Sequence, residues 1–109
     1  MKSYNLGPLE TEVMDFLWVQ KSSTVSDVQR FLKKKNHKIA YTTVMTIMGR
    51  LMRKGLLERE LEGKAYLYSP KISRERSLKN VVERTVSSLI DQYGIEAVTA
   101  FTSEIKKHK

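Results

Sequence analysis

Hydroxyl and guanidinium side chains are spaced along residues 40–55 so that they share one side of a helix. At 3.6 residues per turn, small hydroxyls come first, then cations, with no acid among them: Thr42, Thr43, Thr46, Arg50 and Arg53. A threonine hydroxyl both donates and accepts hydrogen bonds, and an arginine fork matches a guanine edge or a phosphate. Short threonines also let a helix backbone approach the floor of a major groove. The face therefore predicts DNA contact; the alternative is the solvated face of an ordinary globular helix.

The other side of the same stretch predicts the packing that would hold this surface in place. Ala40, Val44, Ile47 and Leu51 are spaced four, three and four residues apart, as in the seam of an amphipathic helix. Gly55 stands where a left-handed C-terminal cap belongs. The sequence thus predicts a helix with one buried and one exposed face.

Positive charge is concentrated around this predicted helix. The formal net charge is +8, from 20 lysines and arginines against 12 aspartates and glutamates. No acid occurs between Asp27 and Glu58, an interval that contains Arg30, Lys33, Lys34, Lys35, Lys38, Arg50, Arg53 and Lys54. Such an interval is typical of a nucleic-acid face. A membrane-surface helix is the competing interpretation, but such helices place Trp, Phe and Leu opposite their cations, where this one has threonines.

Catalytic and metal-binding patterns are sparse. The two histidines, His37 and His108, have no paired carboxylate nearby in sequence, and the chain has no cysteine, glycine-rich phosphate loop or nucleophile elbow. Glu58, Glu60 and Glu62 alternate along one predicted strand, where solvation is a simpler interpretation than cation binding. We therefore expect no enzyme activity, no cofactor and no metal site.

The flanking segments predict a winged helix-turn-helix over residues 1–70. Gly7 and Pro8 suit the start of a first helix, with Leu9, Val13, Phe16 and Leu17 as its apolar stripe. Thr24 and Asp27 form a capping box for a second helix. After the central helix, two alternating runs flank Gly63-Lys64, which predicts a β-hairpin with Lys64 at its tip. The predicted fold class is mainly α with this hairpin as a wing.

Residues 71–109 predict two further helices separated near Tyr93-Gly94. Their apolar stripes have no place in the core of the first domain, so we expect them to form a homodimer interface. Packing back on the same subunit is the alternative. The predicted interface residues are Leu78, Val82, Val86, Leu89, Ile95, Val98 and Phe101.

Three segments together resemble the penicillinase-repressor family, which contains β-lactam-responsive and copper-responsive repressors. They are LGPLETEVMDFLW (Leu6 to Trp18), AYTTVMTIMGRLMRKGLL (Ala40 to Leu57) and AYLYSP (Ala65 to Pro70). The resemblance implies a winged-helix repressor that binds palindromic operators as a dimer and controls antibiotic-resistance or related stress genes. Position by position, it places base-reading residues on the central helix and phosphate contacts at its end and on the wing. The predicted DNA-binding residues are Tyr41, Thr42, Thr43, Thr46, Arg50, Arg53, Lys54 and Lys64.

Two departures from the family pattern concern regulation. Copper-responsive members carry a cysteine-rich metal hook, and this chain has no cysteine. Antibiotic-responsive members are cleaved just before a phenylalanine; the similar place here is Ala100-Phe101, with Ala instead of the usual Asn, and it implies a membrane-bound sensor protease as a partner. Longer relatives continue beyond the position of Lys109, so we expect a weaker free dimer here.

The sequence has no feature that predicts secretion or insertion into a membrane. The N-terminus has no apolar segment typical of a signal peptide, and no apolar run is long enough to span a bilayer. We therefore expect a cytoplasmic protein without membrane insertion. The alternative function is a winged-helix protein-interaction module that binds no specific DNA.

Overall fold

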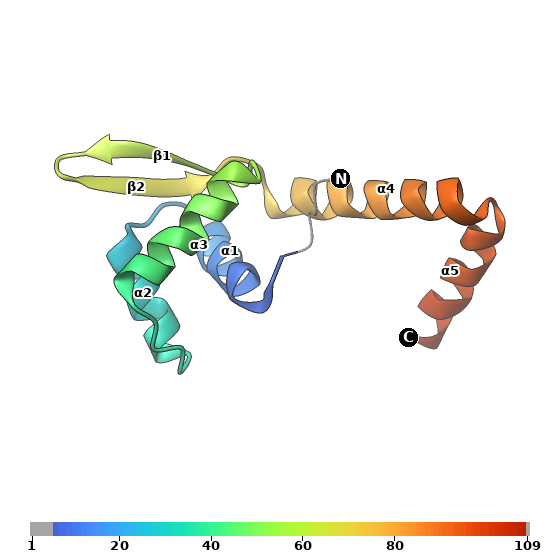
Figure 1. Ribbon diagram of the computed structural model, residues 1–109, viewed down its shortest axis with the longest axis horizontal. Helices are drawn as coiled ribbons and strands as arrows, with labels where there is room; N and C mark the ends of the chain where they lie inside the picture. Colours follow the sequence, from blue (N-terminus) through green and yellow to red (C-terminus); the bar gives the residue numbers. More distant parts are fainter. Residues whose placement is uncertain (1–5, 109) are drawn as a thin grey trace. The chain divides into compact units, whose positions relative to one another are not determined.

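The computed structural model describes residues 6–108. The chain divides into two compact units, and the boundary in the sequence lies between Arg74 and Glu75. In chain order the first unit contains α1 (Pro8–Gln20), α2 (Val25–Lys34), α3 (Tyr41–Arg53), β1 (Leu57–Glu62) and β2 (Ala65–Pro70) (Figure 1). The second contains α4 (Arg74–Tyr93), apart from its first residue, and α5 (Glu96–Lys107). This order confirms the predicted fold class, mainly α with a hairpin wing.

Local capping explains where the first two helices begin. At α1, Gly7 is the N-cap, Pro8 occupies the first turn, and the Gly7 amide donates to Glu10 Oε1 at 3.1 Å. At α2, the Thr24 amide donates to Asp27 Oδ2 and the Asp27 amide donates to Thr24 Oγ1, each at 3.1 Å. These reciprocal bonds satisfy amides that have no partner inside the helix, as the predicted capping box requires.

The end of α3 is equally well defined. Gly55 has a φ of +80°, its amide donates to the carbonyl of Met52 at 3.0 Å, and the Leu56 amide donates to the carbonyl of Leu51 at 3.0 Å. This pair of bonds is a Schellman motif, which needs a left-handed residue and therefore favours glycine. The predicted cap is confirmed, and it turns the chain from α3 into β1.

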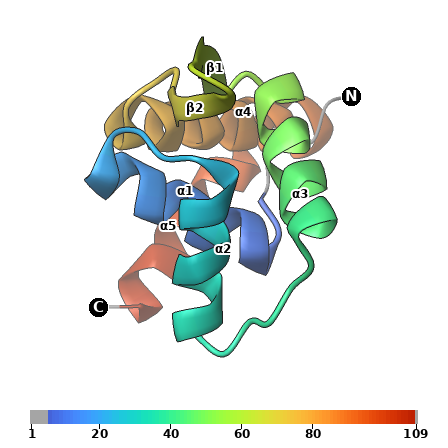
Figure 2. The ribbon, with the colours of Figure 1, turned by 90° about the vertical axis from the view of Figure 1, so that its left-hand side faces the viewer.

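The core of the first unit joins the three helices to the base of the hairpin (Figure 2). Its buried side chains are Val13, Met14, Leu17, Val25, Val28, Leu32, Val44, Ile47, Met48, Leu51, Leu57 and Tyr68. Three of the four predicted seam positions of α3 are among them. The fourth, Ala40, is exposed because it precedes the helix as the N-cap residue. Met14 and Met48 belong to the core although the predicted stripes omitted them.

The hairpin pairs β1 with β2 antiparallel, with Leu57 opposite Pro70 and Glu62 opposite Ala65. Its two-residue turn has Gly63 at φ +63°, a conformation that glycine adopts without strain. A further backbone bridge joins Ser23, just before α2, to Tyr68, through bonds of 2.9 and 2.8 Å. This bridge ties the base of the wing to the helices.

The second unit has apolar stripes but no buried side chain among its described residues. The predicted break between its helices is confirmed: Gly94 has a φ of +76°, and its amide donates to the carbonyl of Ile90 at 2.7 Å. Leu78 is 57% exposed and Ile95 is 76% exposed. Within residues 6–108, none of the helices has the length and apolarity needed to cross a membrane.

Candidate nucleic-acid interface

The polar face of α3 is exposed as the spacing predicts. Thr42, Thr43, Thr46, Arg50 and Arg53 are all solvent-exposed, while the opposite face of the helix enters the core. The Thr46 hydroxyl donates to the carbonyl of Thr42 at 3.0 Å. Its oxygen can still accept a hydrogen bond, and its methyl group remains free for apolar contact. The helix therefore presents short side chains first and two cations in its last turn.

Two exposed side chains on α3 extend this surface. Tyr41, which the sequence included, is 45% exposed at the first helical position. Met45, which it did not include, is 47% exposed. Met45 is apolar like the buried Met48, and only its angular position on the helix separates the two. A flexible thioether on this face can pack against a thymine methyl group.

The start of α3 differs from the starts of α1 and α2. Its N-cap, Ala40, has no side-chain oxygen with which to accept a bond from the first-turn amides, and that turn contains no acid. An uncapped helix N-terminus is favourable to phosphate, because free amides and the helix dipole both face the anion. The neighbouring Lys38 is exposed and adds a cation beside it.

The hairpin that forms the wing has further exposed cations. Lys64 is exposed in the turn, as predicted. Arg59, which the sequence reasoning did not single out, lies with its guanidinium carbon 3.9 Å from the centre of the Tyr66 ring. Its Nη1 donates to the Tyr68 hydroxyl at 3.0 Å, and this bond raises the pKa of the Arg59 guanidinium. Strand alternation was the available signal, since it places Arg59 and both tyrosines on one face.

The opposite face of the hairpin is acidic. Glu58, Glu60 and Glu62 stand opposite Ser69, Leu67 and Ala65, and all three glutamates are exposed. No group of three acids or histidines with metal-binding geometry occurs among residues 6–108. The wing therefore has one cationic, aromatic face and one acidic face, and only the first suits a polyanion.

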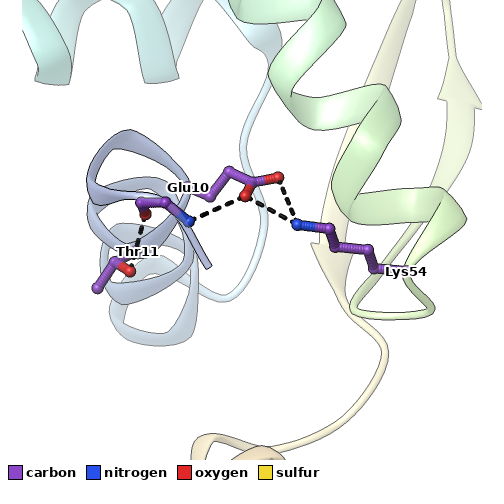
Figure 3. A network of polar contacts seen from close by, with 4 residues as sticks. Glu10, Thr11 and Lys54 are labelled. Atoms are coloured by element: carbon purple, nitrogen blue, oxygen red, sulfur yellow. Dashed lines mark hydrogen bonds and ion pairs between the residues drawn. The ribbon is translucent and has the colours of Figure 1, made fainter. Parts of the chain in front are cut away.

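Lys54, which is predicted to contact phosphate, is engaged within the first unit. Its ammonium donates to Glu10 Oε1 at 2.8 Å and to Oε2 at 3.1 Å (Figure 3). Burial raises the pKa of Glu10, but hydrogen bonds from Lys54 and Gly7 and the charges of Lys54 and Arg50 outweigh it, so the net pKa is lowered. The pair joins the start of α1 to the end of α3.

A second polar contact also joins segments that are distant in sequence. His37 Nε2 lies 2.8 Å from Glu12 Oε2, which links the connection before α3 to α1. The carboxylate comes from α1, so positions near His37 in the sequence do not reveal it. Both side chains are partly exposed, and the contact supports the position of α3.

The predicted dimer residues line the exposed stripes of α4 and α5. Leu78, Val82, Ile95, Val98 and Phe101 are exposed. Val86 and Leu89 are half-buried. An open, mainly apolar groove of about 470 Å³ runs between the two helices, lined by Leu89, Tyr93, Glu96, Ala97, Ala100, Phe101 and Glu104. The predicted cleavage position, Ala100-Phe101, thus lies inside α5 on the wall of this groove.

Three helices, a two-stranded wing and an exposed polar face on the third helix define the first unit as a winged-helix domain. A family model described as penicillinase repressor matches residues 6–109, so the chain belongs to the penicillinase repressor family. The transcriptional regulator BlaI of Mycobacterium tuberculosis, in strains CDC 1551 / Oshkosh and H37Rv, is 39% identical over 75 residues. That match covers 68% of this chain and 54% of the relative, so it spans about half the length of these curated relatives.

Solved structures agree with this assignment. The DNA-binding domain of the repressor BlaI, solved in solution, matches with a TM-score of 0.57 at 31% identity, over 68% of this chain and 90% of that chain. Monomeric Bacillus licheniformis BlaI, in complex with the blaP half-operator, matches with a TM-score of 0.55 at 30% identity. This match covers 69% of this chain and 92% of that chain. MepR, a transcription regulator of the Staphylococcus aureus multidrug efflux pump MepA, matches with a TM-score of 0.58 at 15% identity, over 96% of this chain and 78% of that chain. At this identity the match shows likeness of fold alone.

Proposed function

We propose that this chain is a transcriptional repressor that binds specific duplex DNA through α3 and the wing. The observation that carries the proposal is the exposed threonine and arginine face of α3, set in an acid-free interval on a winged-helix fold. Membership of the penicillinase repressor family and the likeness to BlaI bound to a half-operator support it. The same findings favour DNA over a partner protein as the ligand of this face.

Each part of the surface has a distinct task in this proposal. Thr42, Thr43 and Thr46 let α3 lie close to the base edges, and Arg50 forks onto a guanine. Tyr41 and Arg53 contact the flanking backbone. Lys64 and Arg59 on the wing bind phosphates, which adds affinity without reading sequence. Because the acids of the hairpin lie on its other face, the wing has one favourable orientation toward DNA.

We propose further that α4 and α5 form a homodimer, so that two winged units read a palindrome. Their stripes are exposed in the single chain, and covering them removes apolar area from water. The interface residues are those predicted: Leu78, Val82, Val86, Leu89, Ile95, Val98 and Phe101. Linking two half-site readers raises the effective concentration of the second one.

The family resemblance extends the proposal to regulation. The genes controlled are antibiotic-resistance or related stress genes, and a membrane-bound protease relieves repression by cutting between Ala100 and Phe101. This bond lies within α5, so cleavage requires the helix to open locally, which helices with few buried contacts do readily. Cutting there separates the end of α5 from the rest of the dimer interface.

Selection of DNA from a randomised duplex pool tests the function directly. The full chain is expected to enrich a palindromic sequence and to bind it more tightly than a scrambled duplex of the same composition. Enrichment of no sequence, with equal binding to both duplexes, would contradict specific recognition and leave the protein-interaction module as the better interpretation.

A further inference from the structure

The contact between Glu10 and Lys54 joins an acid of α1 to one of the predicted DNA-binding residues, at the end of α3. Lys54 is the C-cap residue of α3, one helical turn after Arg50 and on the same edge of the helix. On a bare helix its ammonium would stand beside the DNA-facing arginine. In the structure it is held instead by both carboxylate oxygens of Glu10, at 2.8 and 3.1 Å.

The carboxylate is itself fixed in place by the start of its own helix. Glu10 Oε1 accepts the Gly7 amide at 3.1 Å, and the Gly7 carbonyl accepts the amide of Thr11 at 2.9 Å and its hydroxyl at 3.0 Å (Figure 3). The carboxylate of Glu10 therefore cannot swing out with Lys54 without giving up a bond that caps α1. This arrangement keeps the acceptor preorganised.

Burial distinguishes this pair from the surface ion pairs of the chain. The side chain of Glu10 is 12% exposed and that of Lys54 is 26% exposed. In the pair between Lys107 and Glu104 the exposed fractions are 69% and 63%. Salt screens shielded pairs much less than exposed ones, so the Glu10–Lys54 pair persists in salt that weakens surface pairs.

We propose that Glu10 limits the affinity of the chain for DNA: it withholds Lys54 from the DNA backbone and fixes the end of α3 against α1. Every cation that reaches phosphate strengthens binding to all sequences alike. Holding Lys54 on Glu10 removes one such contact, and the carboxylate places a negative charge near Arg50 that disfavours close phosphates. Both effects weaken binding to every sequence and leave base reading unchanged, so Glu10 limits the affinity for DNA and not the sequence preference.

The inference rests on the proposed function and is tested with the full chain and two duplexes. The probes are the palindrome selected from the randomised pool and a scrambled duplex of the same composition, with affinities measured across a sodium chloride series. Glu10→Gln is expected to bind the scrambled duplex several-fold more tightly and to steepen its plot of log affinity against log salt by about 0.9, the value for one added phosphate contact. The palindrome is expected to gain affinity by the same factor, so the ratio of the two affinities should stay at the parent's value.

Three variants separate this role from loss of stability or of charge. Asp15→Asn removes one exposed acid from the same helix but leaves Lys54 paired, and it is expected to keep the parent's affinity for both duplexes. Lys54→Gln breaks the same pair without freeing a cation, and it should keep the parent's salt slope. Glu10→Gln combined with Lys54→Gln should return the slope to the parent's value.

Several results would overturn the inference. A shallower slope for Lys54→Gln would mean that Lys54 already contacts phosphate in the parent, and this arm decides the matter even if Glu10→Gln fails to fold. A Glu10→Gln variant that folds, by circular dichroism, and binds both duplexes as Asp15→Asn does would also overturn it. A parent that enriches no sequence would instead overturn the proposed function.

Discussion

The two units of the chain use apolar side chains in opposite ways. In the winged unit, Met48 and Leu51 of α3 are completely buried, and the helices close around them. In the helical unit, Val82 is 46% exposed and Val98 is 42% exposed, although α4 and α5 have stripes of similar composition. Both sets of side chains follow the 3.6-residue period of a helix, but only the first is covered within its own unit.

The apolar stripes therefore have different roles in the two units. In the winged unit the pattern is satisfied internally, which gives a rigid platform for the polar face of α3. In the helical unit the same kind of pattern is not buried within the unit, and this is the basis of the proposed homodimer. A stripe therefore predicts that a helix will bury one face, and the surroundings decide whether that happens within the chain or between chains.

The largest expected effect is on the core of the winged unit. Met48→Ala should lower the free energy of unfolding by about 2–5 kcal/mol, because it leaves a cavity among packed side chains. Met45→Ala, on the exposed face of the same helix, should change it by less than about 0.5 kcal/mol. Urea denaturation of the full chain measures both. Equal losses would break the distinction between the two faces of α3.

The next effect concerns the helical unit, where stability and assembly should separate. Val98→Asp would bury an unpaired carboxylate in the proposed dimer and should weaken dimerisation by about tenfold or more, while leaving the unfolding of the winged unit unchanged. Thr99→Asp, at the neighbouring exposed position, is the control. Sedimentation with and without the selected palindrome measures assembly. A parent that stays monomeric and binds one copy per palindrome would refute the dimer.

Arg50→Ala tests whether the winged unit reads bases. Loss of one bidentate base contact should reduce affinity for the selected palindrome by about 1–3 kcal/mol and relax the preference at one base pair. Arg30→Ala on α2, whose guanidinium pairs with Asp27, is a charge-matched control. Fluorescence anisotropy on the palindrome and the scrambled duplex measures the difference. Base reading by this face would be ruled out if both variants lost affinity equally on both duplexes.

The Glu10–Lys54 pair should make the stability of the winged unit depend on acid. In the folded protein the pKa of Glu10 is lowered from 4.5, so the unfolded chain takes up the proton first. The contribution of the pair, about 1 kcal/mol by the usual net worth of a hydrogen bond, is present above pH 4.5 and is lost as the pH falls below it. Urea midpoints of the parent and Glu10→Gln should converge in that range. If the difference between the two urea midpoints stayed constant as the pH fell to the folded-state pKa of Glu10, this dependence of stability on pH would be wrong.

The smallest effect distinguishes the cations of the two units. Lys64→Ala should reduce the slope of log affinity against log salt by about 0.9 on both duplexes, because one phosphate contact is lost. Lys107→Ala removes the same charge from α5, where the lysine pairs with Glu104, and should leave the slope unchanged. If the two variants behaved alike, the effect would reflect net charge and not a contact by the wing.

The sequence by itself determined the features that depend on neighbouring residues. The capping box of Thr24 and Asp27, the left-handed Gly55 and the turn at Gly63 are each set by a few consecutive positions, and the structure has them as predicted. The threonine and arginine face of α3 was equally readable, because helical periodicity alone separates it from the seam. These features need no information about which distant segments meet.

Only the tertiary structure decided the contacts between segments that are far apart in the chain. Lys54 pairs with Glu10, Ser23 bridges to Tyr68, and His37 meets Glu12. Periodicity gives the face on which a side chain lies, but not the acid, ring or backbone that packing brings to it. Lys54 therefore looked like a free cation on the DNA face, and only the approach of α1 to the end of α3 showed that its charge is already satisfied.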